Sequence, residues 1–244
     1  MAETGHAINV ANLKKAVQIA TGWGAKYQPS NPLISIANMT TAAAAADDSL
    51  DDVQANTTPY RNATAAADDA FEPLSKLTTR VVKAMKAQGI AASVIEDANT
   101  YARKIKGERA TPKKKNNPST PTVDESKSSV SASQMSRTQR IEHFDSLNSV
   151  LASQPLYAPN EDDLKVETLK TYSNDLKAKT DAVTTTFVPF SNSLAARDQV
   201  LYTNDDSVVH VGKLFKTYID AAFGRTSSEW NQIKGLMFRE LSRS

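Results

Sequence analysis

Apolar residues recur at helical spacing along most of the chain. Val10, Leu13 and Val17 lie near the spacing of one helix face, so we expect a first short helix over residues 8–22. Two further stripes repeat every seven residues, which predicts long helices packed against neighbours at shallow angles, as in a bundle. The stripes are Met39, Ala46, Val53 and Tyr60, and Leu169, Leu176, Val183 and Phe190.

The same periodicity predicts helices in the later part of each half of the chain. One runs from about residue 60 to 88 and another from about 190 to 222, where the polar segment 202–206 loosens it. Each is followed by a last helix. The inward residues of these last helices are Ala92, Val94, Ile95, Ala98, Tyr101 and Ile105, and Trp230, Ile233, Leu236, Met237 and Leu241.

The segment from Tyr27 to Lys86 recurs, without a gap, 130 residues later in the chain. The identities are several times more frequent than composition alone would give, and an internal repeat determines how a fold is assembled. The identical pairs are Tyr27/Tyr157, Pro29/Pro159, Thr41/Thr171, Asp51/Asp181, Val53/Val183, Pro59/Pro189, Asn62/Asn192, Ala65/Ala195, Ala66/Ala196, Asp68/Asp198, Val81/Val211, Lys83/Lys213 and Lys86/Lys216.

Both copies of the repeat begin with a tyrosine followed by a helix-start signal. Ser30 or Asn31 in the first copy and Asn160 in the second are good N-caps. The tyrosine before each cap is expected to pack back on the helix as a staple or core anchor. Pro59 and Pro189 then interrupt the two long patterns at the same point. A turn between antiparallel helices is favoured there over a kinked continuous helix.

Residues 107–133 separate the two copies. They are rich in Pro, Lys, Asn, Ser and Thr, a composition typical of a linker. We therefore predict an all-α protein of two tandem-duplicated helical-bundle halves, about four helices each, related by a pseudo-twofold axis. The first repeat spans residues 1–106, the basic Pro- and Ser-rich linker 107–133, and the second repeat 134–244.

Composition narrows the class of protein further. A net charge of +2 is close to balance, and the absence of cysteine excludes disulfides, thiolate metal sites and cysteine nucleophiles. The first residues lack the basic start and apolar core of a signal peptide, and the chain has no run of 18 apolar residues, which argues against a transmembrane segment. A cytoplasmic protein is therefore expected.

Residues capable of catalysis or metal binding are sparse. His6, His143 and His210 lie far apart and form no metal-binding pair motif, so we expect no metal site and no cofactor. Asp68 and Asp198 are the strongest carboxylate candidates because they are equivalent in the two copies, yet pairing with Lys or Arg explains them more simply. Nucleophile elbows, kinase loops and dinucleotide fingerprints are absent, so we expect no enzyme activity.

The strongest local charge is basic and lies at the start of the linker. Such a run can dock on acidic patches of another subunit, stay solvated, or bind nucleic acid or an anionic membrane through its phosphates. The candidate contact residues are the basic Arg103, Lys104, Lys106, Arg109, Lys113, Lys114 and Lys115 and the acidic Asp47, Asp48, Asp51, Asp52, Glu161, Asp162 and Asp163.

Several segments together form a recognisable pattern, namely residues 3–7 and 9–12, 70–77, 109–114, 131–136 and 155–161. With this pattern the chain resembles a family of uncharacterised, cysteine-free, all-helical proteins of Bacteroidota. The likeness extends over nearly the whole chain and implies a bacterial helical protein, with no established activity to transfer.

These observations favour a non-enzymatic structural protein that self-assembles into a homo-oligomer, filament or tubule. Duplication gives a subunit two similar faces, and faces that do not close on each other generate open assemblies. The linker and the termini are expected to wrap neighbouring subunits. The alternative is a binding module that uses the basic linker on nucleic acid or an anionic surface.

Overall fold

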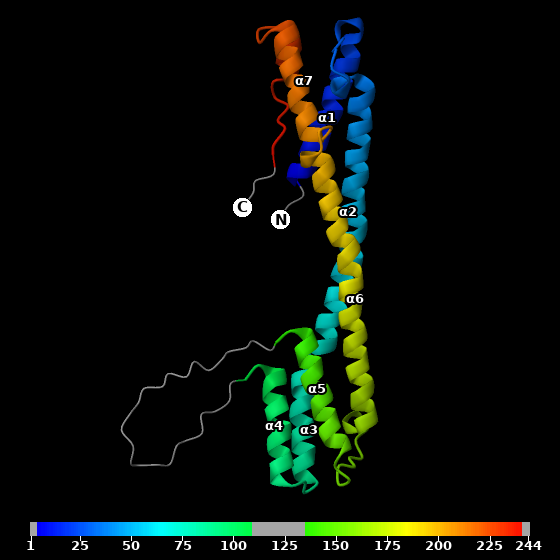
Figure 1. Cartoon of the computed structure of the whole chain (residues 1–244), viewed down its shortest axis with the longest axis vertical. Coiled ribbons are helices and arrows are strands. Elements are labelled where there is room, and N and C mark those ends of the chain that lie inside the picture. The colour runs from blue at the N-terminus through cyan, green and yellow to red at the C-terminus, as the bar shows by residue number, and fades with distance from the viewer. Residues whose placement is uncertain (1–3, 109–134, 241–244) are drawn as a thin grey trace, which may run out of the picture. The chain divides into compact units, whose positions relative to one another are not determined.

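The computed structural model describes residues 4–108 and 135–240, and it is all-helical with no strand in these two ranges (Figure 1). The predicted all-α class is confirmed. The linker residues 109–133 and the extreme termini, which were expected to wrap neighbours, lie outside the described residues. The helices are α1 (Thr4–Trp23), α2 (Ile36–Phe71), α3 (Leu74–Ala87), α4 (Ala92–Lys106), α5 (Arg137–Ala152), α6 (Val166–Asp198), α7 (Val208–Phe223) and α8 (Ser228–Ile233).

The chain divides into two compact units, one of which combines the two ends of the sequence while the other is a continuous middle segment. Unit 1 comprises residues 1–61 and 186–244, and unit 2 comprises residues 62–185. The boundaries therefore fall inside the long helices α2 and α6. The repeats expected at 1–106 and 134–244 are divisions of the sequence, and the compact units cut across both of them.

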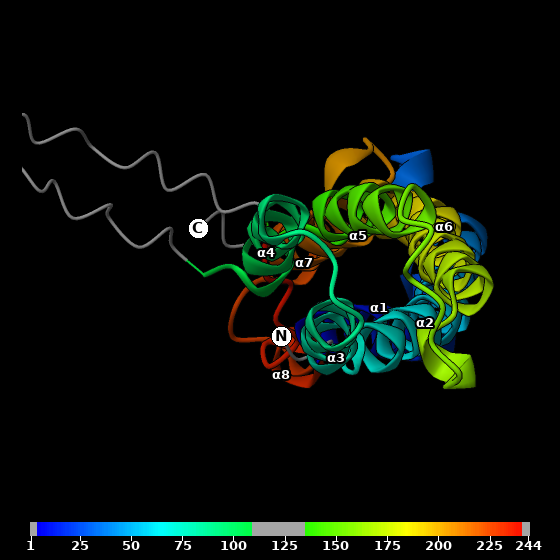
Figure 2. The same ribbon diagram turned by 90° about the horizontal axis from the view of Figure 1, so that it is seen from below.

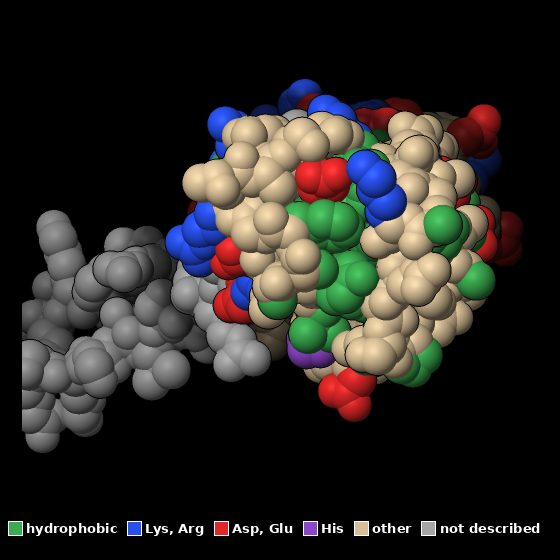
Figure 3. All heavy atoms as spheres, turned by 90° about the horizontal axis from the view of Figure 1, so that it is seen from above, with side chains coloured by type: hydrophobic (Ala, Val, Ile, Leu, Met, Phe, Trp, Pro, Cys, Tyr) green, Lys and Arg blue, Asp and Glu red, His purple; other side chains and the backbone are tan. Residues whose placement is uncertain are grey.

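Unit 1 is built on the contact between α1 and α7. Leu13 and Ala16 of α1 and Phe215 and Ile219 of α7 are 0% exposed. At the end where α1 leads into α2, aromatic rings contact one another, and Figure 3 shows hydrophobic side chains reaching the surface at this end. The ring contacts there join Trp23, Tyr27, Phe215, Tyr218 and Phe223.

Unit 2 is a small bundle in which α4 packs against both α3 and α5 (Figure 2). Its core collects the apolar faces of these helices and of the first part of α6. In α3, for example, the buried residues recur at the spacing of a single helix face, so the helix buries only that face. The buried residues of α3 are Leu74, Thr78, Val81, Val82 and Met85.

The two long helices begin in the same way. A short 3-10 turn, Pro32–Ile34 or Asp162–Leu164, precedes each helix. Tyr27 donates its hydroxyl hydrogen to the carbonyl of Ile34 at 2.5 Å, and Tyr157 donates to the carbonyl of Leu164 at 2.9 Å. Both tyrosines are buried, at 6% and 7% exposure, so the predicted role as core anchors is confirmed.

The capping prediction holds in one copy only. Asn31 accepts a hydrogen bond from the backbone amide of Leu33, as expected, and Ser35 then caps α2 by accepting from the amide of Asn38. In the second copy the cap position of the 3-10 turn is Glu161, with no side-chain hydrogen bond, and not Asn160. Acidic residues in that first turn supply a favourable interaction with the helix dipole instead.

The prediction of a turn at each proline is wrong, because Pro59 lies inside α2 and Pro189 inside α6. A proline deprives one carbonyl of its helical donor, but packing can hold the helix together across this defect. Here Tyr60 stacks on Phe190 with the ring centroids 5.1 Å apart and the planes at 11°. The kinked or continuous helix, the lesser alternative, is the one observed.

Two other helix predictions need correction. A single helix over residues 60–88 was expected, but the chain breaks between α2 and α3 at Glu72 and Pro73. The expected last helix over residues 230–241 ends early, at Ile233, and residues 235–240 are not helical. No helix among the described residues is long and apolar enough to cross a membrane.

Candidate functional site

The basic run begins on the last turn of α4. Arg103, Lys104 and Lys106 stand there, and Gly107 ends the helix with a positive φ of 70°. Cations at this end interact favourably with the partial negative charge of the helix C-terminus, so they also stabilise the helix. The remaining members of the run, Arg109, Lys113, Lys114 and Lys115, lie outside the described residues.

Lys104 stands close enough to α5 to influence a histidine. The pKa of His143 lies below its ordinary value because the ring is partly buried and, to a smaller degree, because Lys104 is near. Both effects disfavour the imidazolium form. His143 is therefore biased towards the neutral form.

The first acidic cluster lies on α2 and is partly engaged within unit 1. Asp47 forms an ion pair with Lys14 of α1, and this pair joins the two helices. Asp48, Asp51 and Asp52 are exposed on the same helix. These three carboxylates are the accessible part of the cluster.

The second acidic cluster lies at the 3-10 turn before α6. Asp163 forms an ion pair with Arg80 of α3, and Asp162 forms one with Lys165 at 2.6 Å. The hydrogen bond from Lys165 lowers the pKa of Asp162. Glu161 is exposed. These acidic residues therefore serve contacts within unit 2, where the described ion pairs of Asp162 and Asp163 are made with Lys165 and Arg80 and not with the basic turn of α4.

The equivalent carboxylates Asp68 and Asp198 both pair with arginine, as the sequence suggested. Asp68 lies 2.6 Å from the guanidinium of Arg137, and Asp198 lies 2.7 Å from that of its neighbour Arg197. The two partners do not occupy equivalent positions in the sequence repeat. Among the described residues, no group of three or more His, Asp or Glu is placed to hold a metal ion.

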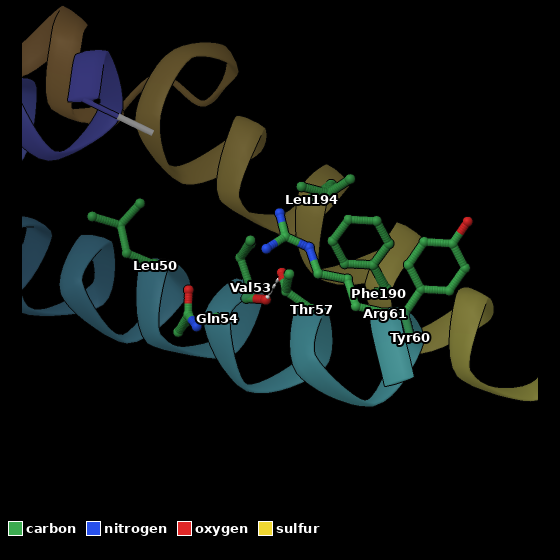
Figure 4. Close-up of a pocket in the computed structure, with 8 residues that line it drawn as sticks. All are labelled: Leu50, Val53, Gln54, Thr57, Tyr60, Arg61, Phe190 and Leu194. Carbon is green, nitrogen blue, oxygen red and sulfur yellow. Dashed lines mark hydrogen bonds between the residues drawn. The ribbon is translucent and has the colours of Figure 1, made fainter. Parts of the chain in front are cut away.

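In unit 1, a cavity of about 360 Å³ lies between α2 and α6 (Figure 4). Of its lining residues only Arg61 is charged. Next to it the ring of Tyr60 stacks on Phe190 and contacts Phe187 at 5.6 Å. The lining residues are Leu50, Val53, Gln54, Thr57, Tyr60, Arg61, Phe190 and Leu194.

This surface is apolar beyond the cavity itself. Phe187 and Val188 are 46% and 52% exposed. Exposed aromatic side chains next to a shallow cavity are typical of an interaction surface. Sequence reasoning identified Phe190 from the seven-residue stripe but missed Phe187, whose only signal was its place two residues before Pro189.

No family model, curated protein or solved structure matches this chain. The site is therefore interpreted from its own geometry.

Proposed function

We propose that the protein is a non-enzymatic structural protein that self-associates into homo-oligomers or filaments. The observation that carries this proposal is the composition of the two compact units. α1 packs with α7, which comes from the other end of the chain, and α4 packs with α5, which follows the linker. Each unit thus takes helices from both proposed copies of the repeat.

The local structure supports descent from a duplicated unit. α2 and α6 begin 130 residues apart, each after a 3-10 turn and a buried tyrosine, and each contains one interior proline. The same tyrosine-to-carbonyl hydrogen bond closes both turns. A pseudo-twofold axis is the simplest relation between two such copies.

The sharing of helices between copies supports self-association. When two identical units exchange elements, each compact body contains part of both, which is the arrangement of a domain-swapped dimer. In this chain the two copies that exchange helices are joined in one polypeptide. A second chain carries the same helices, so it can supply the same helix faces to complete a unit.

Exposed apolar surface provides a contact area for self-association. The surface around Phe187 and Val188 is uncovered in the single chain, and burying apolar area contributes about 25 cal/mol for each Å² removed from water. Asp48, Asp51 and Asp52 add an exposed acidic patch on α2. The basic linker supplies the opposite charge, as the sequence suggested.

Size-exclusion chromatography with light scattering and negative-stain microscopy tests the proposal. Species larger than one chain are expected at high protein concentration and low salt. A matched pair of variants gives the control: Phe187→Ser removes an exposed apolar contact, while Thr40→Ser changes an exposed residue at the start of α2. A chain that stays monomeric in all these conditions would end the proposal.

The second candidate function is binding of nucleic acid or an anionic surface by the basic run. The clustering of Arg103, Lys104 and Lys106 at one helix end favours it. It predicts binding that falls steeply with salt, because cations that neutralise phosphates release counterions. Replacement of residues 113–115 by Glu would abolish that binding, whereas the self-association proposal predicts that it weakens oligomers without nucleic acid present.

A further inference from the structure

The chain after α8 lies along unit 1 in the manner of a bound peptide. Residues 234–240, here called the strap, run back alongside α7 as the red segment in Figure 1. Leu236 and Phe238 are 4% and 9% exposed, while Met237 between them is 55% exposed. This alternation is that of an extended segment with one side against a surface.

Side chains of α1 hold the backbone of the strap. Asn9, only 1% exposed, donates from Nδ2 to the carbonyl of Arg239 at 2.9 Å and accepts from the amide of the same residue at 3.0 Å. Asn12 donates from Nδ2 to the carbonyl of Met237 at 2.8 Å. A side-chain amide that satisfies both backbone groups of one residue takes the place of a neighbouring strand, as in recognition of extended peptides.

A lysine of α7 holds the beginning of the strap. Lys216 donates from Nζ to the carbonyls of Leu236 at 2.8 Å and Lys234 at 3.2 Å. Partial burial lowers the pKa of this amine, because burial disfavours its charged form. The amine also lies 5.7 Å from the ring centre of Trp230 in α8.

Two further contacts fix the register of the strap on α7. The ring of Phe238 lies so close to Gly212 that a Cβ atom there would be 2.4 Å from it. Lys213, the next residue of the helix, forms an ion pair with Glu240. The residues of α1 and α7 that contact the strap, here called the groove, are Asn9, Asn12, Gly212, Lys213 and Lys216. They contact backbone groups, the ring of Phe238 and an acidic side chain.

We propose that the groove between α1 and α7 is a peptide-binding site, and that the strap of a second copy of this chain occupies it. The inference rests on the proposed self-association and names one interface for it. The side-chain hydrogen bonds and the ion pair to residues 236–240 come from α1 and α7, and every copy carries the same strap. Whether a strap binds its own groove or a neighbour's depends on the short connection at Lys234 and Gly235, where the glycine has open space around it.

Exchange of straps between copies is favoured at high protein concentration. The same hydrogen bonds and anchors form in either case, so exchange has a low cost, as in domain swapping. A strap tethered to its own groove has an effective concentration on the order of mM, so the closed form prevails in dilute solution. At higher local concentration each copy can give one strap and receive another, which links chains head to tail.

Thiol cross-linking of full-length chains tests the proposal, because the protein has no cysteine of its own. Lys213→Cys and Glu240→Cys are made separately and together, incubated at high concentration, and treated with a short bismaleimide. Both changes remove an ion pair that is 50% and 74% exposed and therefore contributes little. The chain carrying both cysteines is expected to link internally, which establishes docking of the strap.

A mixture of the two single variants is expected to give a covalent dimer several-fold in excess of a control mixture of Glu240→Cys with Lys76→Cys. Lys76 is an exposed residue of α3 in unit 2 and makes none of the contacts described for the strap. Adding Asn9→Ala to the Lys213→Cys chain should reduce the dimer, because the strap loses two backbone hydrogen bonds. Adding Met237→Ala to the Glu240→Cys chain should leave the dimer unchanged.

Internal linking without dimer above the control would overturn the proposal and show that the groove serves only its own strap. If light scattering still finds oligomers in that case, self-association survives and uses another face. Failure of internal linking in a chain whose circular dichroism matches that of the unmodified protein would overturn the strap contact itself. Each result thus separates the interface from the proposed function.

Discussion

Because the ring of Phe238 packs on Gly212 of α7, we predict that Gly212→Ala destabilises the protein when Phe238 is present and stabilises it when Phe238 is replaced by alanine. Gly212 is buried within α7, and a Cβ atom added to it would lie 2.4 Å from two carbons of the Phe238 ring. Where nothing packs on a helix, replacing glycine by alanine stabilises it by about 0.5–1 kcal/mol. Here the ring must move, although Asn9 and Asn12 hold the backbone on both sides of it.

The magnitude follows from what the ring buries. Phe238 is 9% exposed, and burial of a phenylalanine side chain is worth about 1.5–3 kcal/mol. Loss of most of this exceeds the gain in helix propensity, so Gly212→Ala should lower the free energy of unfolding by about 1–2 kcal/mol. In a Phe238→Ala chain no ring is displaced, and the same change should raise it by about 0.5–1 kcal/mol.

Urea unfolding followed by circular dichroism at the helix band measures all four chains of this double-mutant cycle. Met237→Ala is the control, because its side chain is 55% exposed, and it should change the free energy of unfolding by less than about 0.5 kcal/mol. Stabilisation by Gly212→Ala in both backgrounds would refute the reasoning, since the ring would then not lie on the glycine.

Three further predictions concern the long helices and unit 2. Pro59→Ala and Pro189→Ala should each raise the free energy of unfolding by about 1–2 kcal/mol, since both prolines are exposed and each removes a helix donor. A decrease in the free energy of unfolding, measured by urea unfolding, would contradict this. Burial raises the pKa of Tyr157 and of Tyr172 to about 12. The fold thus favours their neutral forms, so stability is retained below about pH 10 and falls from there towards pH 12. Replacing either by Phe should make that fall shallower in urea titrations, and an unchanged slope would argue against buried hydroxyls. Asp68→Asn should lower the free energy of unfolding by less than about 0.5 kcal/mol, because its carboxylate is 67% exposed; a loss of several kcal/mol in the same assay would show a larger role.

The seven-residue stripes predicted the buried positions in the first part of each long helix, whereas their later members Tyr60, Val183 and Phe190 are only partly buried. Met39 and Ala46 are 0% exposed, and Leu169 and Leu176 are 1% and 0% exposed. Periodicity succeeds here because a helix can bury only one face, and the residues on that face recur at fixed spacing. The two tyrosine anchors were also predictable, because each precedes a helix start and a side chain at that position packs back on the helix.

The prolines show where local rules stop. A missing hydrogen bond at Pro59 predicts a helix end, yet α2 continues through it, and the next residue, Tyr60, stacks on Phe190 from α6. That contact joins residues far apart in the sequence, so no local pattern contains it. Tertiary packing here outweighs a local defect.

Which helices pack against each other could likewise not be predicted from the sequence. If α1 and α5 are copies of one element, and α3 and α7 copies of another, each first helix has two possible partners with similar apolar faces. The pattern cannot choose between them, whereas the structure pairs α1 with α7. The strap was missed for a related reason, because Ile233, Leu236 and Met237 recur at helical spacing and therefore predicted a continued helix.

Self-association is the claim on which the account depends, and sedimentation velocity over a wide range of protein concentration at low salt tests it most directly. The account predicts a mass above that of one chain that grows with concentration, and a smaller proportion of large species when Asn9→Ala weakens the groove. A single species with the mass of one chain at every concentration would contradict it.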